Sequence, residues 1–426
     1  MDYKNKIENN RINGLPLWAK ALLLNALTAF IAIIPFVIRG HGFFAMSNDF
    51  NAQQIPFNLL MNSAFRKGDL LWNWNLDLGA NLLESMSFYD IGSPFTLLMA
   101  LLPNTAVPYA IPWMMMLKFA VAGVTSAVYA ARFCKYERTA LLVSVLYAFS
   151  GWQLISSVFY HFQDMAALFP LLLIGMEKLN TEGKKGLMAG ACALNAVCNP
   201  VFFIGEAVFA VLYYVFRFML PRIEENKGIS LRSSIGKTVS RIMSNITEGI
   251  LGCLIAGVCL VPAVRGITDI PRASNMIAVS KFFSMPPVRW LYMIQSFFFP
   301  AEAMSRYSAI ASVNWGTRSA YLSLFGMVFV IAFALRNKGH WMKRLIAACL
   351  VIACVPILNL VFQLFRGTNW EARWFYMPVL IMAMMTGLFI EQTMDHMESE
   401  VNQDSWAVYT ASAFTILFIV IYVLLT

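Results

Sequence analysis

The chain is poor in charged residues. Only 13% of its 426 residues are Asp, Glu, Lys or Arg, whereas 59% are hydrophobic, and the mean hydropathy is +0.63. An ordinary soluble domain carries about 25% charged residues. A soluble core of this length cannot hide so much apolar surface, so the composition excludes a soluble globular protein. Lipid must be the solvent for most of the chain.

The apolar runs also lack the strict alternation of apolar and polar residues that a membrane β-barrel needs. They are apolar on all sides and about 20 residues long, which is the length of an α-helix that crosses the hydrocarbon core. We therefore predict an all-α membrane protein, a polytopic bundle of about 11 transmembrane helices. The predicted helices cover residues 21–38, 111–131, 139–159, 165–179, 186–199, 202–219, 246–264, 319–335, 345–364, 374–391 and 406–425.

Several common chemical fingerprints are missing. There is no Walker loop, no Gly-x-Ser-x-Gly motif and no dinucleotide fingerprint, so nothing in the sequence is built to use ATP or NAD directly. The seven cysteines show neither metal-binding spacing nor a pairing pattern, and we interpret them as packed thiols. No cofactor is certain from the sequence.

The basic residues define an orientation. Lys and Arg exceed Asp and Glu by 32 to 23, and many of them lie in the N-terminal tail and in the loop 217–241. Because cytoplasmic loops of membrane proteins are enriched in Lys and Arg, we predict a cytoplasmic N-terminus. Membrane topology accounts for the net charge of +9, so we predict the lipid bilayer, and no nucleic acid, as a partner.

This orientation divides the chain into four parts. Residues 1–20 form a cytoplasmic tail, and residues 21–264 form a membrane module that includes a long outside loop at 39–110. A second long outside loop follows at 265–318, and the C-terminal helices occupy 319–426. The first loop is rich in aromatic and apolar residues, so we expect short interfacial helices there.

Asp49 is the first acid of the outside loop and lies just after the first long apolar run. A carboxylate at the boundary between lipid and water is partly desolvated, which suits a general base. Gln53 and Gln54 follow it, and their amides suit hydrogen bonds to an acceptor. The alternative is that Asp49 is an ordinary loop acid or a helix cap.

A second group of polar and aromatic residues suits a sugar. Trp72, Trp74 and Tyr89 offer stacking surfaces, and Asn75 offers hydrogen bonds to hydroxyl groups. An aromatic belt at the membrane interface is the alternative interpretation of these residues.

His161 and Asp164 lie in the next, short outside turn and are further candidates for binding the acceptor or its sugar. With Asp49 they make a divalent cation possible, although one His and two scattered acids are a weak metal pattern. Asp164 can instead cap the helix at 165–179.

Three basic residues are candidates for binding a phosphate. Lys118 lies within the second predicted helix, where an ionisable group needs a cavity or a partner. Arg373 begins the tenth helix, and its planar fork suits a phosphate. Arg265 begins the second long outside loop. Snorkelling to the interface is the alternative for Lys118 and Arg373, and Lys118 can also simply pair with an acid.

Four blocks of the sequence resemble the YfhO family of bacterial membrane proteins. They read DFNAQQIPF from Asp49, GDLLWNWNLDLGANLLESMSFYDIGSPF from Gly68, HFQDMAALFPLLLIGMEKL from His161 and RWFYMP from Arg373. The resemblance to the YfhO family extends over most of the chain. The YfhO family in turn resembles the GT-C class of polytopic glycosyltransferases.

This resemblance implies a GT-C-like fold and a function. The implied activity is a glycosyltransferase that moves a sugar from a polyprenyl-phosphate-linked donor to an extracytoplasmic acceptor, such as a teichoic-acid-like polymer or another surface glycan. Asp49 matches the position of the catalytic acid in that class. The active site is expected to face the outside of the bacterial cell membrane, with a flippase and a donor-synthesising glycosyltransferase as possible partners.

The resemblance also marks one departure. Asp164 stands where some members of the class place a second acidic motif, but this chain has a single acid there. Two other functions stay open: a transporter or flippase for lipid-linked sugars that uses Lys118, Glu206 and Asp164 as a charged pathway, and a non-catalytic assembly subunit.

Overall fold

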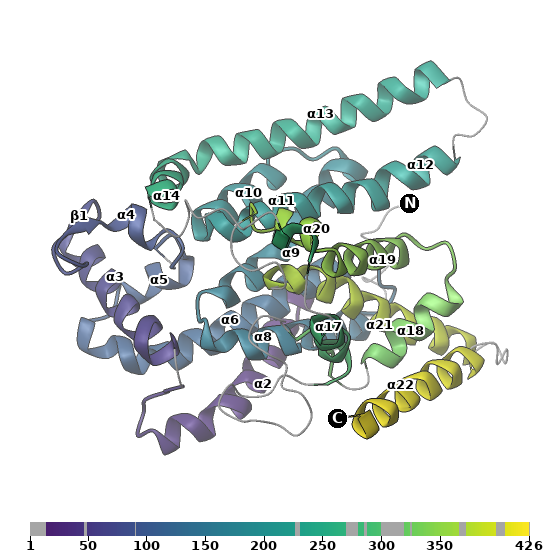
Figure 1. The fold of residues 1–426 in the computed structure, drawn as a ribbon, viewed down its shortest axis with the longest axis horizontal. Coiled ribbons are helices and arrows are strands. Elements are labelled where there is room, and N and C mark those ends of the chain that lie inside the picture. Colours follow the sequence, from purple (N-terminus) through teal and green to yellow (C-terminus); the bar gives the residue numbers. More distant parts are fainter. Residues whose placement is uncertain are drawn as a thin grey trace.

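The computed structural model confirms an all-α protein. It describes residues 14–46, 49–89, 91–225, 231–269, 280–284, 288–299, 319–323, 326–365, 372–397 and 405–425. Within these ranges the extended structure is limited to two strands of two residues each. The fold is a bundle of helices with a smaller group of short elements at one side (Figure 1).

The first predicted span is a single helix, α2, Leu17–Arg39. Short elements fill the first long loop: the π-helix η1 (Phe50–Gln54), α3 (Ile55–Lys67), β1 (Trp72–Asn73), β2 (Ala80–Asn81), α4 (Leu82–Met86), α5 (Pro94–Met99) and η2 (Asn104–Ala106). The two strands pair antiparallel, with Trp72 opposite Asn81. The expected short helices are therefore present in this loop.

The centre of the bundle is formed by α6 (Val107–Ala130), α7 (Glu137–Ala148), α9 (Phe162–Glu182) and α10 (Leu187–Cys198). Helix α6 packs against α2, α7 and α9, and α10 packs against α9. Almost every residue in the first turns of α9 is buried, so the N-terminal end of this helix lies inside the protein.

The predicted helix at 139–159 is interrupted. Helix α7 ends at Ala148, and α8 (Gly151–Ile155) and the 3-10 turn η3 (Ser156–Val158) follow. Gly151 N donates a hydrogen bond to Tyr321 O at 2.8 Å. A Cβ atom on Gly151 would lie 2.2 Å from Ser319 Oγ, so the close approach of residues 319–321 requires glycine at this break.

The next helices are partly longer and partly shorter than predicted. Helices α11 (Pro200–Tyr214), η4 (Val215–Met219) and α12 (Leu220–Glu225) follow one another without a break. The predicted helix at 246–264 is divided between α13 (Leu231–Ile255) and α14 (Gly257–Asp269), whose segments meet at an angle of 77°.

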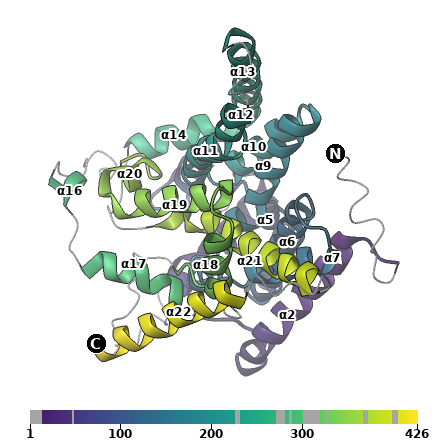
Figure 2. The same ribbon diagram turned by 90° about the vertical axis from the view of Figure 1, so that its right-hand side faces the viewer.

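The C-terminal part surrounds α21 (Tyr376–Met397), which is buried along most of its length. Helix α21 packs against α7, α18 and α19 (Figure 2). The elements of this part are α16 (Ser280–Phe283), α17 (Val288–Phe298), α18 (Gly326–Arg336), α19 (Trp341–Cys354), α20 (Pro356–Val361), η5 (Arg373–Phe375) and α22 (Ser405–Leu425). Most of the second predicted outside loop, 265–318, lies outside the described residues.

In the described part of the chain, five helices are long and apolar enough to cross a membrane, or six if the bent pair α13–α14 counts as one span. Helices α10, α18 and α22 are shorter apolar helices. The multi-pass architecture is therefore confirmed, whereas the number of about 11 spans stays a prediction.

Candidate functional site

Polar residues from distant parts of the sequence meet at the N-terminal end of α9. Lys118 of α6 and Asp164 of α9 form an ion pair with Nζ and Oδ1 2.5 Å apart, and both side chains are 0% exposed. Asp164 lies in the first turn of α9, whereas His161 holds the N-cap position and makes no capping hydrogen bond with its side chain. The expectation that Asp164 caps this helix is therefore wrong.

The ammonium group of Lys118 has further partners. It donates a hydrogen bond to the backbone oxygen of Tyr160 at 3.0 Å and lies over the Tyr160 ring, with Phe95 also within reach. A buried charge is tolerated only when it is paired and hydrogen-bonded. Lys118 therefore connects α6 to the turn that precedes α9; binding of a phosphate by this residue stays a prediction.

His161 joins this turn to the first outside loop. Its Nδ1 lies 2.9 Å from Gln54 Oε1, and the rings of Phe88 and Tyr89 each have centroids 5.1 Å from the imidazole. Burial, followed by the charges of Lys118 and Arg373, holds the pKa of His161 well below its ordinary value. The imidazole is neutral at physiological pH, and both basic residues are close enough to influence it.

The hydrogen bond between Gln54 and His161 also bears on the position of Asp49. Gln54 is the last residue of η1, and Asp49 directly precedes this π-helix. The Asp49 side chain is half-buried, and Gln53 Nε2 lies 3.4 Å from its Oδ1. Hence the carboxylate stands at the start of a short helix whose other end is bound to the turn before α9. Single π-helical turns are frequent at functional sites.

Arg373 approaches the same turn from the C-terminal part. Its guanidinium carbon lies 5.6 Å from the centroid of the Phe162 ring. Beside it is a cavity of about 150 Å³, lined mainly by apolar side chains that include Phe202, Phe362 and Trp374. Arg373 itself contributes to this lining, and a cation in the wall of a mainly apolar cavity suits an amphiphile with an anionic head.

Glu206 lies in the interior close to this cavity. The Tyr376 hydroxyl, whose ring contributes to the cavity lining, donates a hydrogen bond to Glu206 Oε1 at 2.8 Å. Glu206 is fully buried on α11. Of the three residues considered as a charged pathway, Lys118 and Asp164 are paired with each other, and Glu206 is bound to Tyr376.

Not all predicted sugar-binding residues meet at this place. Tyr89 does, through its contact with His161. Trp72 and Trp74 contact each other and are 52% and 75% exposed. They lie with the exposed Asn75 on and beside the hairpin β1–β2, which Figure 1 shows at the outer edge of the molecule, away from α9.

Arg265 is also placed elsewhere. It is an exposed residue of α14, and this helix packs against α4. The structure therefore assembles Gln54, Lys118, His161, Asp164 and Arg373 in one region and leaves Arg265 on a different helix.

The described residues contain no group of three or more His, Cys, Asp or Glu side chains that is placed to hold a metal ion. Asp164 is occupied by Lys118, and His161 by Gln54. The possible divalent cation between Asp49, His161 and Asp164 is thus not supported by the geometry. All seven cysteines lie among the described residues and are free thiols there, as expected.

Sequence reasoning missed the polar residues around the break after α7. Gln153, Ser156 and Ser157 are buried, as is Gln163 in the first turn of α9. Gln163 Nε2 donates a hydrogen bond to Ser157 Oγ at 3.1 Å. For Gln153, Ser156 and Ser157 the available signal was their polar side chains inside an otherwise apolar predicted helix, 139–159.

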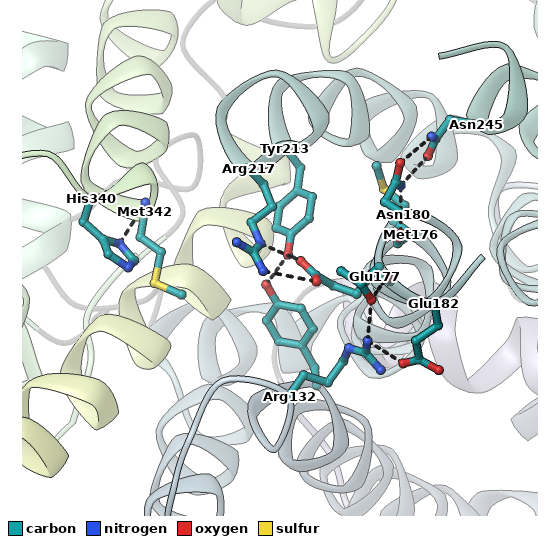
Figure 3. A network of polar contacts seen from close by, with 12 residues as sticks. Arg132, Met176, Glu177, Asn180, Glu182, Tyr213, Arg217, Asn245, His340 and Met342 are labelled. Atoms are coloured by element: carbon teal, nitrogen blue, oxygen red, sulfur yellow. Dashed lines mark hydrogen bonds and ion pairs between the residues drawn. The ribbon is translucent and has the colours of Figure 1, made fainter. Parts of the chain in front are cut away.

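A separate polar network holds the other end of α9. Glu177 accepts hydrogen bonds from the Tyr213 hydroxyl at 2.6 Å and from Arg217 Nε at 2.9 Å (Figure 3). Arg132 of the segment after α6 binds Glu182 at 2.8 Å. These contacts join α9 to α6 and α11, so the orientation of α9 is determined at both of its ends.

Comparison with known proteins agrees with this architecture. The model of the family described as "Bacterial membrane protein YfhO" matches residues 21–426. A protein named "Uncharacterized protein YfhO" from Bacillus subtilis (strain 168) is 23% identical over 234 residues, which are 51% of this chain and 26% of that protein. The aligned region thus spans about a quarter of the relative's length. No solved structure matches the chain. Since the family model extends over nearly the whole sequence, the chain belongs to the YfhO family of bacterial membrane proteins.

Proposed function

We propose that the protein is a membrane glycosyltransferase that moves a sugar from a polyprenyl-phosphate-linked donor to an extracytoplasmic cell-envelope acceptor. The observation that carries the proposal is the hydrogen bond between Gln54 and His161. It brings the helix that follows Asp49 to the turn before α9. The guanidinium group of Arg373, from the C-terminal part of the chain, lies over the ring of Phe162, the first residue of α9.

The proposed reaction is a single displacement. The Asp49 carboxylate takes the proton of an acceptor hydroxyl while the hydroxyl oxygen attacks the anomeric carbon of the donor sugar. The bond between that carbon and the phosphate oxygen breaks, and its electron pair leaves with the polyprenyl phosphate. One displacement of this kind inverts the anomeric centre.

Arg373 and the neighbouring cavity support a lipid phosphate as the donor. The guanidinium group is a fork of donors that matches phosphate oxygens, and it can stabilise the charge that develops on the leaving group. The apolar cavity beside it is suited to the first carbons of a prenyl chain. Phosphate binding by Lys118 is less favoured, because Asp164 and Tyr160 already hold its ammonium group.

A transporter or flippase for lipid-linked sugars is the second candidate. The fully buried charges of Lys118 and Asp164 favour it, since ionisable groups within membrane proteins often mark a transport pathway. A non-catalytic assembly subunit, which would place a partner transferase, is the third. Neither of these functions needs Asp49 as a base.

The deciding experiment uses the intact protein in detergent, where no sealed membrane exists. Polyprenyl phosphate carrying radiolabelled glucose or N-acetylglucosamine is supplied with purified lipoteichoic acid, and transfer of label is measured. We expect turnover by the wild type and a loss of about 10²–10⁴-fold in Asp49→Asn, the contribution typical of a general base. Near-normal transfer by Asp49→Asn would exclude Asp49 as the base. Absence of transfer by the wild type, with translocation of the same lipid in vesicles, would favour the flippase.

A further inference from the structure

Buried polar atoms without a hydrogen-bond partner gather around the N-terminal end of α9. Among the described residues, they include atoms of Ser150, Trp152, Gln153, Ser156, His161 and Gln163. For Gln153 both the amide oxygen and the amide nitrogen are unpartnered within the described part of the chain. All six side chains are essentially inaccessible in this structure.

The clustering of these buried, unpartnered polar atoms needs an explanation. Buried polar groups in native proteins are nearly always hydrogen-bonded, because an unmade bond carries the full desolvation penalty of the group. The six residues occupy one short stretch, from the break after α7 to the first turn of α9. Groups of this kind are satisfied by water or by a bound polar molecule.

The contacts place this stretch beside the proposed donor site. Gln163 Nε2 donates to Ser157 Oγ, and Ser157 Oγ donates to the backbone oxygen of Gln153, so the two amide residues are neighbours. The ring of Trp152 lies 4.8 Å from that of Tyr376, which contributes to the cavity at Arg373.

Aromatic rings lie beside the buried polar groups. Trp152 faces Phe162 in a stacked arrangement with ring centroids 6.5 Å apart, and the Arg373 guanidinium lies over the same Phe162 ring. Amides, hydroxyls and an indole N–H beside aromatic faces are groups that bind both the hydroxyls and the apolar faces of a sugar ring. Phosphate and sugar of one donor would then be bound by adjacent groups.

We infer that Gln153, Gln163 and Trp152 bind the sugar of the lipid-linked donor, with Ser156 as a further hydroxyl contact. This inference rests on the proposed function, because it assigns the sugar-binding part of the same site. The exposed Trp72 and Trp74, by contrast, lie on the hairpin away from α9. Donor discrimination therefore belongs to the buried stretch between α7 and α9.

The test is a binding measurement on the intact, detergent-purified protein by native mass spectrometry. Polyprenyl phosphate is titrated with and without a glucosyl or N-acetylglucosaminyl group. We expect the wild type to prefer a sugar-bearing lipid, and Gln153→Met and Gln163→Met to lose that preference by about five-fold or more, as expected for lost hydrogen bonds. Binding of the bare polyprenyl phosphate should be unchanged in both variants.

Two further variants serve this experiment. Asn245→Ala removes an amide that is hydrogen-bonded to Asn180 at the opposite end of α9. Asn180 lies about 25 Å along the helix from Gln163. This variant should therefore keep the full preference for sugar-bearing lipid. Ser156→Ala is a milder change within the site and replaces the methionine variants if these do not fold. Loss of the preference for sugar-bearing lipid in Ser156→Ala would support the inference, and an unchanged preference would contradict it.

The results separate the two proposals. If a wild type that transfers sugar bound bare and sugar-bearing lipid equally, the inference would be overturned, because the buried polar atoms would then bind water only. The proposed function would still stand. No binding of either lipid, together with no transfer, would overturn both.

Discussion

Gln54 Oε1 lies 2.9 Å from His161 Nδ1, although the two residues are 107 positions apart in the chain. This hydrogen bond connects the first outside loop to the start of α9. Because the imidazole is buried between aromatic rings, the contact holds the C-terminal end of η1, the short helix that Asp49 directly precedes.

The first prediction concerns this contact. Gln54→Leu should lower transfer about 2–10-fold, the effect of one hydrogen bond of about 0.5–1.5 kcal/mol on the position of Asp49. Membrane insertion should be unaffected. The measurement is the transfer assay in detergent; Gln53→Leu, whose contact with Asp49 is longer at 3.4 Å, is the matched comparison. A larger loss in Gln53→Leu than in Gln54→Leu would contradict the assigned order of importance.

The second prediction concerns the buried ion pair. Lys118→Met removes the ammonium group from the buried Asp164 carboxylate, so it should destabilise the protein by about 3–5 kcal/mol. Lys118→Met combined with Asp164→Leu should recover most of this loss, because neither charge of the pair remains. Thermal unfolding in detergent measures both variants.

The control for that experiment is an exposed ion pair. Lys135 and Asp395 are 46% and 37% exposed, and Lys135→Met should cost at most about 1 kcal/mol. If Lys118→Met were as mild as Lys135→Met, the burial of the Lys118–Asp164 pair would be in doubt.

The third prediction concerns pH. The lowered pKa of His161 means that the unfolded chain binds a proton below about pH 6.5, whereas the folded protein does not. His161 therefore contributes stability that is present above its ordinary pKa and decreases as the pH falls below it. We expect the apparent Tm of the wild type to fall between pH 7 and pH 5 more steeply than that of His161→Gln, which cannot be protonated in this range. Parallel Tm profiles of the two proteins would contradict this.

The fourth prediction concerns the break after α7. In Gly151→Ala the new Cβ atom would lie 2.2 Å from Ser319 Oγ and 3.0 Å from the Cβ atoms of Ser319 and Tyr321, so we expect a loss of about 1–3 kcal/mol from overpacking. Gly190→Ala is the control, because nothing lies within 4 Å of its Cβ position and it stands inside α10. That variant should be neutral or stabilised by about 1 kcal/mol. Both are measured by thermal unfolding; equal stability of the two variants would refute the close approach at Gly151.

The composition was sufficient for the fold class. A chain with 59% hydrophobic and 13% charged residues has to place its helices in lipid, and the positions of α2, α6, α9, α11 and α21 followed from their apolar runs. Helix breaks were harder to foresee. The interruption at Gly151 depends on residues 319–321, which are far away in the sequence.

The candidate site shows the same division. Sequence reasoning selected Asp49, Gln54, His161, Asp164 and Arg373. It also selected Trp72 and Trp74, which lie away from α9 (Figure 1), and it did not select Gln153. It also suggested a cation between Asp49 and Asp164, whereas Lys118 provides the positive charge beside Asp164.

The sequence by itself determined that this protein is a helical membrane protein and which residue types can carry chemistry. Only the tertiary structure decided which of them meet. The physical reason is that hydropathy and helix periodicity act over neighbouring residues. The contacts of Gln54 with His161 and of Lys118 with Asp164, in contrast, depend on how whole helices pack.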